Sequence, residues 1–86
     1  MATRVLISGR VQGVGFRWSA AAEARRLGVT GTIANRHDGR VEAVVDDGPG
    51  SAELLSWLRH GPSLALVHDV ETSDATETGE DGFRIL

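Results

Sequence analysis

The sequence predicts one α+β domain over residues 1–86, in which a sheet of four or five strands carries two helices on one face. Three observations predict it. The 86 residues are enough for a single compact domain. Apolar residues alternate with a period of two in some segments and recur every three or four residues in others. Turns rich in glycine, proline and aspartate separate these segments.

The first third of the chain is expected to hold one strand and one helix. Residues 4–8 are rich in β-forming side chains and end at Gly9, which predicts a first strand. After a glycine-rich loop, apolar side chains recur at helical spacing, at Phe16, Ala20, Ala24 and Leu27. Gly28 is placed to end this helix, after two arginines that complement the carboxyl end of its dipole.

The middle of the chain predicts a hairpin and a second helix. Residues 29–35 and 41–45 are typical of strands, and an Asp-Gly pair between them is typical of a tight turn. Ser51 is a suitable N-cap for a helix that carries three leucines, and Gly61-Pro62 would end that helix.

The remaining segments complete the sheet. Residues 64–72 predict a fourth strand, residues 73–82 a surface loop, and residues 83–86 a short last strand. The order is then β-α-β-β-α-β with a small extra strand at the end, and its core is two right-handed crossover units interleaved. This order defines a ferredoxin-like sandwich, with an antiparallel sheet of four or five strands and both helices on one face. The fold alone names no function, because binding modules and enzymes share it.

Charge is distributed unevenly along the chain, whose formal net charge is −3. Residues 1–40 hold seven arginines against two acidic residues, whereas residues 41–86 hold two arginines against ten acidic residues. The basic half favours an anionic ligand, while the acidic total argues against a nucleic-acid partner. The absence of lysine excludes a lysine nucleophile or Schiff base.

Other features of the sequence limit the cellular location and the cofactors that can be expected. No charged and apolar leader opens the sequence and no apolar run approaches the ~20 residues of a membrane span, so a cytoplasmic protein with no membrane partner is expected. There is no cysteine, which excludes disulfides and thiolate metal ligands. The three histidines lack a second ligand at metal spacing, so no metal site is expected.

The loop that precedes the first helix has the features of an anion site. Glycines at positions 9, 13 and 15 allow positive φ and can bring several N–H groups to one point, next to the positive end of the helix dipole. Arg17 lies in the first helical turn, where a cation opposes the dipole unless a bound anion offsets it. Its planar fork can bind two phosphate oxygens. The alternative is an ordinary connecting loop with a solvated arginine.

Residues 11–17, Val-Gln-Gly-Val-Gly-Phe-Arg, resemble the V-Q-G-V-x-F-R signature of the acylphosphatase family. The resemblance covers nearly the whole chain, since residues 27–31, 38–42 and 57–62 also match the family in the same order, and Phe83 matches the usual aromatic of the final strand. One departure is Thr32, where many members have tryptophan. It affects the expected packing more than the chemistry.

The resemblance implies a monomeric enzyme that hydrolyses the carboxyl–phosphate bond of acyl phosphates, without cofactor, metal or covalent intermediate. It implies that Arg17 holds the phosphoryl group and Asn35 holds the attacking water. Asparagine is also frequent at turns, which is the alternative for Asn35. The substrate-binding residues that the resemblance implies form the loop: Val11, Gln12, Gly13, Val14, Gly15 and Phe16.

Two other functions are possible for a domain with this order of elements. The main alternative is a regulatory module that binds phosphate or acyl phosphate without catalysis. An RNA-binding domain is disfavoured, because that fold variant needs aromatic side chains on its strands and only Phe83 meets this condition. Trp18 and Trp57 are expected to be packing residues. The phosphate is expected to dominate recognition, so the sequence does not identify the physiological acyl group.

Overall fold

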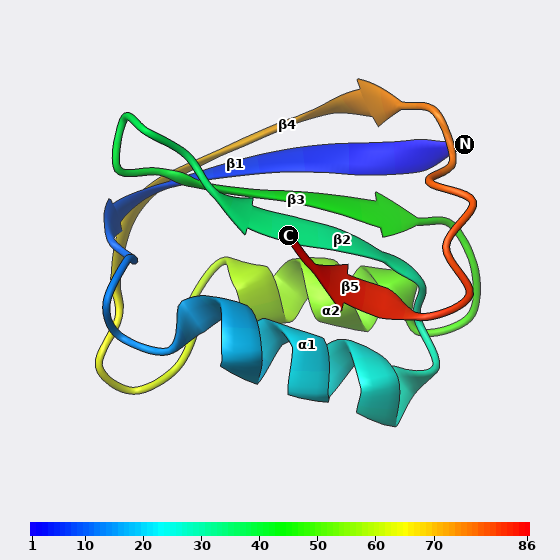
Figure 1. Ribbon diagram of the computed structural model, residues 1–86, viewed down its shortest axis with the longest axis horizontal. Coiled ribbons are helices and arrows are strands. Elements are labelled where there is room, and N and C mark those ends of the chain that lie inside the picture. Colours follow the sequence, from blue (N-terminus) through cyan, green and yellow to red (C-terminus); the bar gives the residue numbers. More distant parts are fainter.

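The computed structural model describes residues 1–86 and contains five strands and two helices (Figure 1). In chain order these elements are β1 (Ala2–Arg10), α1 (Phe16–Leu27), β2 (Gly31–Asn35), β3 (Val41–Asp46), α2 (Ser51–Leu58), β4 (Leu66–Ala75) and β5 (Phe83–Ile85). The predicted order β-α-β-β-α-β is therefore confirmed, with β5 as an added strand. Neither helix is long and apolar enough to cross a membrane.

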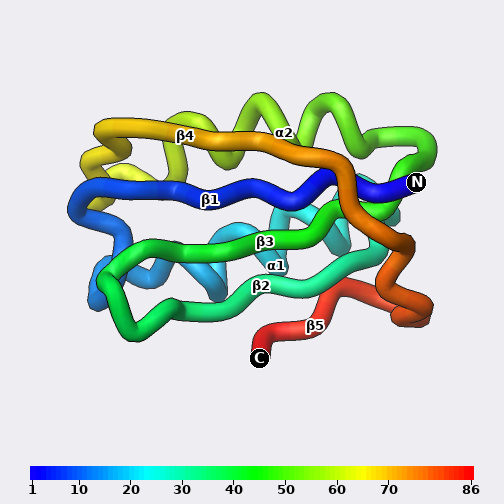
Figure 2. Tube along the Cα trace, turned by 90° about the horizontal axis from the view of Figure 1, so that it is seen from above, coloured from blue at the N-terminus to red at the C-terminus, as the bar shows by residue number.

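The strands form one sheet in the order β4-β1-β3-β2-β5, which Figure 2 shows from above. The first four strands are antiparallel to their neighbours, as predicted. The fifth differs, because β5 pairs with β2 in parallel and makes the sheet mixed. The reason is the connection after β4, which crosses the end of the sheet and reverses direction, so that β5 runs the same way as β2 (Figure 2).

Both helices cover the same face of the sheet (Figure 1). Alternate residues of the central strands point toward them and are fully buried, among them Val5 and Ile7 of β1 and Ile33 of β2. Helix α1 presents Phe16 and three alanines to this layer, and the small side chains let the helix lie close to the strands. The remaining residues of this core cluster are Val11, Val29, Val41, Ala43, Val45, Leu54, Leu58 and Phe83.

The two tryptophans behave differently. Trp57 packs edge-to-face on Phe16, with 5.7 Å between ring centroids, which confirms a packing role. Trp18 is 71% exposed, so the expectation that it packs in the core was wrong. Helical geometry gives the reason, because Trp18 is two positions after the buried Phe16 and therefore points to nearly the opposite side of α1.

Several ends of the strands differ from the expectations by one to three residues, and two boundaries have a clear structural cause. Gly50, with a φ of 88°, is the N-cap of α2, whereas Ser51 is the first helical residue and donates its hydroxyl hydrogen to the Gly48 carbonyl at 2.8 Å. The expected capping role of Ser51 was therefore wrong. Strand β4 continues to Ala75 rather than residue 72, because it pairs with β1 as far as Ala2. This pairing holds polar residues in strand conformation that the sequence pattern assigned to a loop.

Candidate active site

The loop between β1 and α1 places several unpaired N–H groups together. Gly13 and Gly15 have φ values of 76° and 78°, and Gly15 is the N-cap of α1. The N–H groups of residues 12–15 donate no hydrogen bond to any main-chain carbonyl, and the first turn of α1 carries no acidic side chain. These donors and the positive end of the helix dipole are therefore free to bind an anion.

The three glycines of this region have different roles. A Cβ at Gly13 or Gly15 would meet no atom within 4 Å, so space does not require glycine at these positions. The positive φ of the loop backbone is what favours glycine there. Gly9 lies in β1, where a Cβ would approach the Leu66 carbonyl oxygen to 2.1 Å. Gly9 therefore serves the close pairing of β1 with β4, and the expectation that it shapes the anion loop is corrected.

Arg17 and Asn35 meet at this loop from different elements. Arg17 lies in the first turn of α1, and Asn35 is the last residue of β2. Both line a cavity of about 110 Å³, which is small compared with the ~300–1,000 Å³ of typical organic-ligand pockets and suits a compact group such as phosphate. The other lining residues are Val11, Gly13, Gly15, Phe16 and Trp18.

Two of the predicted binding residues do not line the cavity with their side chains. The Gln12 side chain points to the β2–β3 hairpin, where its Nε2 donates to the Arg36 and Arg40 carbonyls at 2.8 and 3.1 Å. Val14 packs against the hydrophobic core. Both residues keep their main-chain N–H groups in the loop, and Gln12 also ties that loop to the hairpin that begins at Asn35.

Arg17 is held in place by the last residue of the sequence. Its Nη1 donates to the main-chain oxygen of Leu86 at 3.1 Å, and it forms no ion pair with a carboxylate side chain. The guanidinium has five N–H donors, so the others remain available to a ligand. The sequence contained no signal for the contact with Leu86, which arises because β5 adds to the sheet beside β2.

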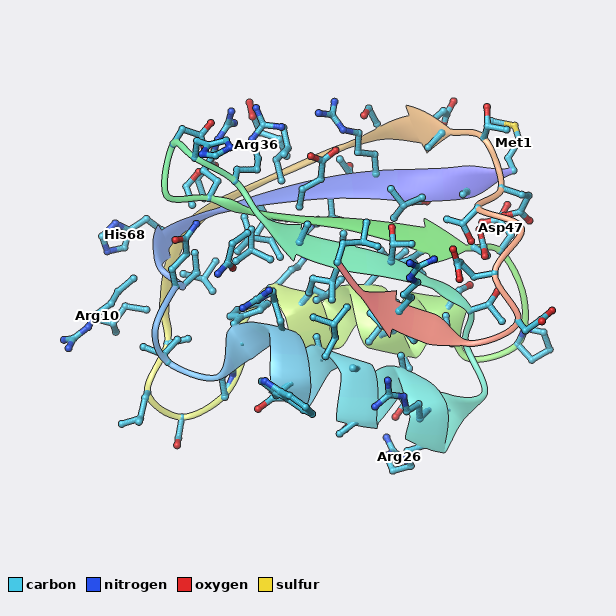
Figure 3. The ribbon with its side chains drawn as sticks, viewed as in Figure 1. Met1, Arg10, Arg26, Arg36, Asp47 and His68 are labelled. Carbon is cyan, nitrogen blue, oxygen red and sulfur yellow. The ribbon has the colours of Figure 1, made fainter.

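The arginines of the hairpin differ from Arg17 because aspartate and glutamate side chains pair with them. Arg36 pairs with Asp38 and Glu42, and Arg40 pairs with Asp38 and Glu71. Hydrogen bonds from the Arg40 side chain and main chain hold the pKa of the Asp38 carboxyl well below its usual range. Figure 3 shows Arg36 at this end of the molecule, while Arg10 extends away from the loop into solvent. Ion pairs within the hairpin and with β4 thus hold the hairpin in place.

Neither of the two larger hollows has the features of a phosphate site. One, of about 510 Å³, is lined by Met1 and residues 74–77, including two carboxylates, and lies at the end of the sheet opposite Arg10 (Figure 3). The other, of about 530 Å³, lies between α1 and β5 and begins at Trp18.

No three histidine, aspartate or glutamate side chains are grouped so that they could hold a metal ion. His60 serves the end of α2, with its Nδ1 3.3 Å from the Ser56 carbonyl oxygen.

The departure at Thr32 lies outside this cavity. Thr32 is half-buried in β2, opposite Val44 of β3 and Arg84 of β5. It does not line the site. Its effect is therefore confined to contacts within the sheet.

The arrangement defines a class of protein, a ferredoxin-like α+β sandwich with a loop of free N–H groups at the start of its first helix. The family model described as Acylphosphatase matches residues 3–85. The acylphosphatase of Thermococcus kodakarensis is 49% identical over 81 residues, which covers 93% of this chain and 89% of that protein. The chain belongs to the acylphosphatase family of enzymes.

Solved structures agree with this assignment. An acylphosphatase from Bacillus subtilis superimposes with a TM-score of 0.88 at 30% identity, covering 99% of this chain and 97% of that one. An acylphosphatase from Coxiella burnetii gives the same TM-score at 35% identity, covering 99% and 90% of the two chains. The family resemblance carried by residues 11–17 is thus confirmed, together with the ferredoxin-like fold.

Proposed function

We propose that the chain hydrolyses acyl phosphates to a carboxylate and inorganic phosphate, without a metal or a covalent intermediate. Arg17 and Asn35 carry the reaction. The observation that supports this proposal best is the shared cavity, which Arg17 and Asn35 line together with Gly13 and Gly15 of the loop that has free N–H groups. Arg17 forms no ion pair with an aspartate or glutamate side chain.

The phosphoryl group binds in the loop. In phosphoryl transfer the charge of the transition state is spread over three equatorial oxygens, so the protein acts mainly by positioning and by stabilising charge. The N–H groups of residues 12–15 and the helix dipole supply fixed positive potential. Arg17 adds a full positive charge and a planar pair of donors that matches two of the oxygens. Together they supply the charge that a metal ion supplies in many phosphoryl-transfer enzymes.

Asn35 orients the attacking water. Its amide oxygen accepts a hydrogen bond from the water and its amide nitrogen can donate one, but neither is basic enough to remove a proton. The water oxygen forms a bond to phosphorus while the bond from phosphorus to the acyl oxygen breaks, and the carboxylate leaves with the electron pair. The proton of the water passes to a phosphoryl oxygen, which is the nearest strong acceptor. A loose transition state makes this possible, because little nucleophile activation is needed.

The test is hydrolysis of benzoyl phosphate in the presence of a chelator. We expect the native chain to hydrolyse benzoyl phosphate. The kcat/KM should fall about a thousandfold or more in Arg17→Ala and about a hundredfold in Asn35→Ala. Arg59→Ala removes an exposed arginine outside the cavity and is the control that keeps full activity. Circular dichroism confirms that each variant is folded. A folded native chain that binds phosphate without turnover would overturn the proposal and favour the regulatory module.

A further inference from the structure

The phosphate cavity is too small to contain a whole acyl phosphate. Its volume is about 110 Å³, and its walls include the main chain of the loop and the buried residues Val11 and Phe16. The acyl group is covalently joined to the phosphoryl group, so it has to leave the cavity through the open side. The surface at that side therefore contacts the acyl group during the reaction.

Trp18 provides the apolar surface at the mouth of the cavity. It is 71% exposed and lines the cavity beside Arg17, its neighbour in the sequence. The other apolar side chains of the lining, Val11 and Phe16, are buried. The face of this exposed indole is well suited to stack on an aromatic or extended aliphatic group.

Trp18 also connects the cavity to the groove between α1 and β5. That groove has a volume of about 530 Å³ and is lined by Trp18, Phe83 and Ile85 on its apolar side. Arg25 fixes the wall on the side of α1, because its Nη2 donates to the Phe83 carbonyl oxygen at 3.1 Å. At the far end Arg84 lies 3.8 Å from Glu80, and Asp81 is a further charged residue of the lining. The groove thus continues from the phosphate site as a partly apolar surface.

We infer that Trp18 and the adjoining α1–β5 groove bind the acyl group, and that they favour aromatic and longer aliphatic acyl phosphates over acetyl phosphate. This inference rests on the proposed function and names the substrate class for it. It replaces the expectation that the acyl group contributes little to recognition. Trp18 acts here as a specificity-determining residue, since the phosphoryl group is bound by other groups.

The test compares two substrates in two proteins. For native protein and Trp18→Ala, kcat/KM is measured with benzoyl phosphate and with acetyl phosphate. We expect Trp18→Ala to lose about tenfold with benzoyl phosphate and less than about twofold with acetyl phosphate. Trp18→Phe should keep most of the preference. Leu64→Ala removes an apolar side chain of similar exposure outside the site and should leave both values unchanged. Inhibition by inorganic phosphate should be equal in native protein and Trp18→Ala.

Equal losses with both substrates, or no loss with either, would overturn the inference while leaving the proposed function intact. If the native chain hydrolyses neither substrate, the proposed function fails, and a binding experiment decides the inference by itself. In Trp57→Phe, Trp18 is the only tryptophan, so its fluorescence reports directly on the groove. Benzoylphosphonate, a stable analogue, should change this fluorescence and bind about tenfold more tightly than methylphosphonate. Equal affinity for the two phosphonates would overturn the inference.

Discussion

Replacing Gly61 by alanine sets a methyl group against the ring of Phe16. Gly61 follows α2 with a φ of 71°, and a Cβ at this position would lie 2.3 Å from Cε2 and 2.9 Å from Cδ2 of Phe16. The Phe16 ring is buried and in contact with Trp57, so it has little room to move away. Phe16 also precedes Arg17 and lines the cavity that contains Arg17 and Asn35, and the displacement should therefore reach the site.

Two effects determine the loss of stability. The left-handed backbone at Gly61 disfavours alanine by about 1–2 kcal/mol. The clash with Phe16 adds about 1–3 kcal/mol, the usual penalty for overpacking a core. Gly28→Ala is the matched control, because Gly28 also ends a helix, has a φ of 70°, and has no atom within 4 Å of the Cβ position. The control experiences only the backbone effect.

Urea unfolding monitored by circular dichroism measures the difference. We expect Gly61→Ala to lose about 1–3 kcal/mol more free energy of unfolding than Gly28→Ala. In a domain of this size that difference lowers Tm by about 4–8 °C for each kcal/mol. Gly61→Ala should also lose kcat/KM for benzoyl phosphate at a temperature where it is folded, whereas Gly28→Ala should not. Equal stability in the two variants would refute the reasoning that Phe16 is rigidly packed.

Two further predictions concern a hydrogen bond that positions the site and a buried carboxylate. Gln12→Ala removes the hydrogen bonds to the Arg36 and Arg40 carbonyls and so loosens the hairpin turn that follows Asn35. We expect kcat to fall about tenfold or more and the free energy of unfolding to fall by about 1–2 kcal/mol. Unchanged kinetics would contradict this positioning role. Burial tends to raise the pKa of Asp46, but hydrogen bonds from Thr78 and Thr30 outweigh it and lower the pKa to about 2. This carboxylate therefore contributes about 2 kcal/mol of stability above pH ~4, and the contribution is lost as the pH falls toward 2. Asp46→Asn should flatten the decline in the free energy of unfolding between these pH values. Asp47→Asn is the control and should leave the decline unchanged.

Much of the fold follows from local patterns in the sequence. The spacing of Phe16, Ala20 and Ala24 predicted both bounds of α1, because a helix is determined largely by its own residues and by Gly28 at its end. Strand β4 was less predictable, since its polar second half is held by pairing with β1. The parallel pairing of β5 depends on the path of a loop across the sheet, which no local pattern encodes.

The site shows the same division. Arg17 and the glycine loop were predicted from their place at the start of a helix, and Asn35 from the family resemblance. The contact of Gln12 with the hairpin could not be predicted, because it joins residues 24 and 28 positions apart through carbonyls that any sequence would supply. Trp18 was assigned to packing, although its two-residue offset from Phe16 already places it on the outer side of the helix.

The central claim is that water attacks phosphorus in the cavity between the loop and Asn35. The most direct measurement is hydrolysis of benzoyl phosphate by the native chain in ¹⁸O-labelled water with a chelator present, followed by mass spectrometry of both products. We predict one labelled oxygen in the inorganic phosphate and none in the benzoate. Label in the benzoate would show attack at the carbonyl carbon and would contradict the roles of Arg17 and Asn35.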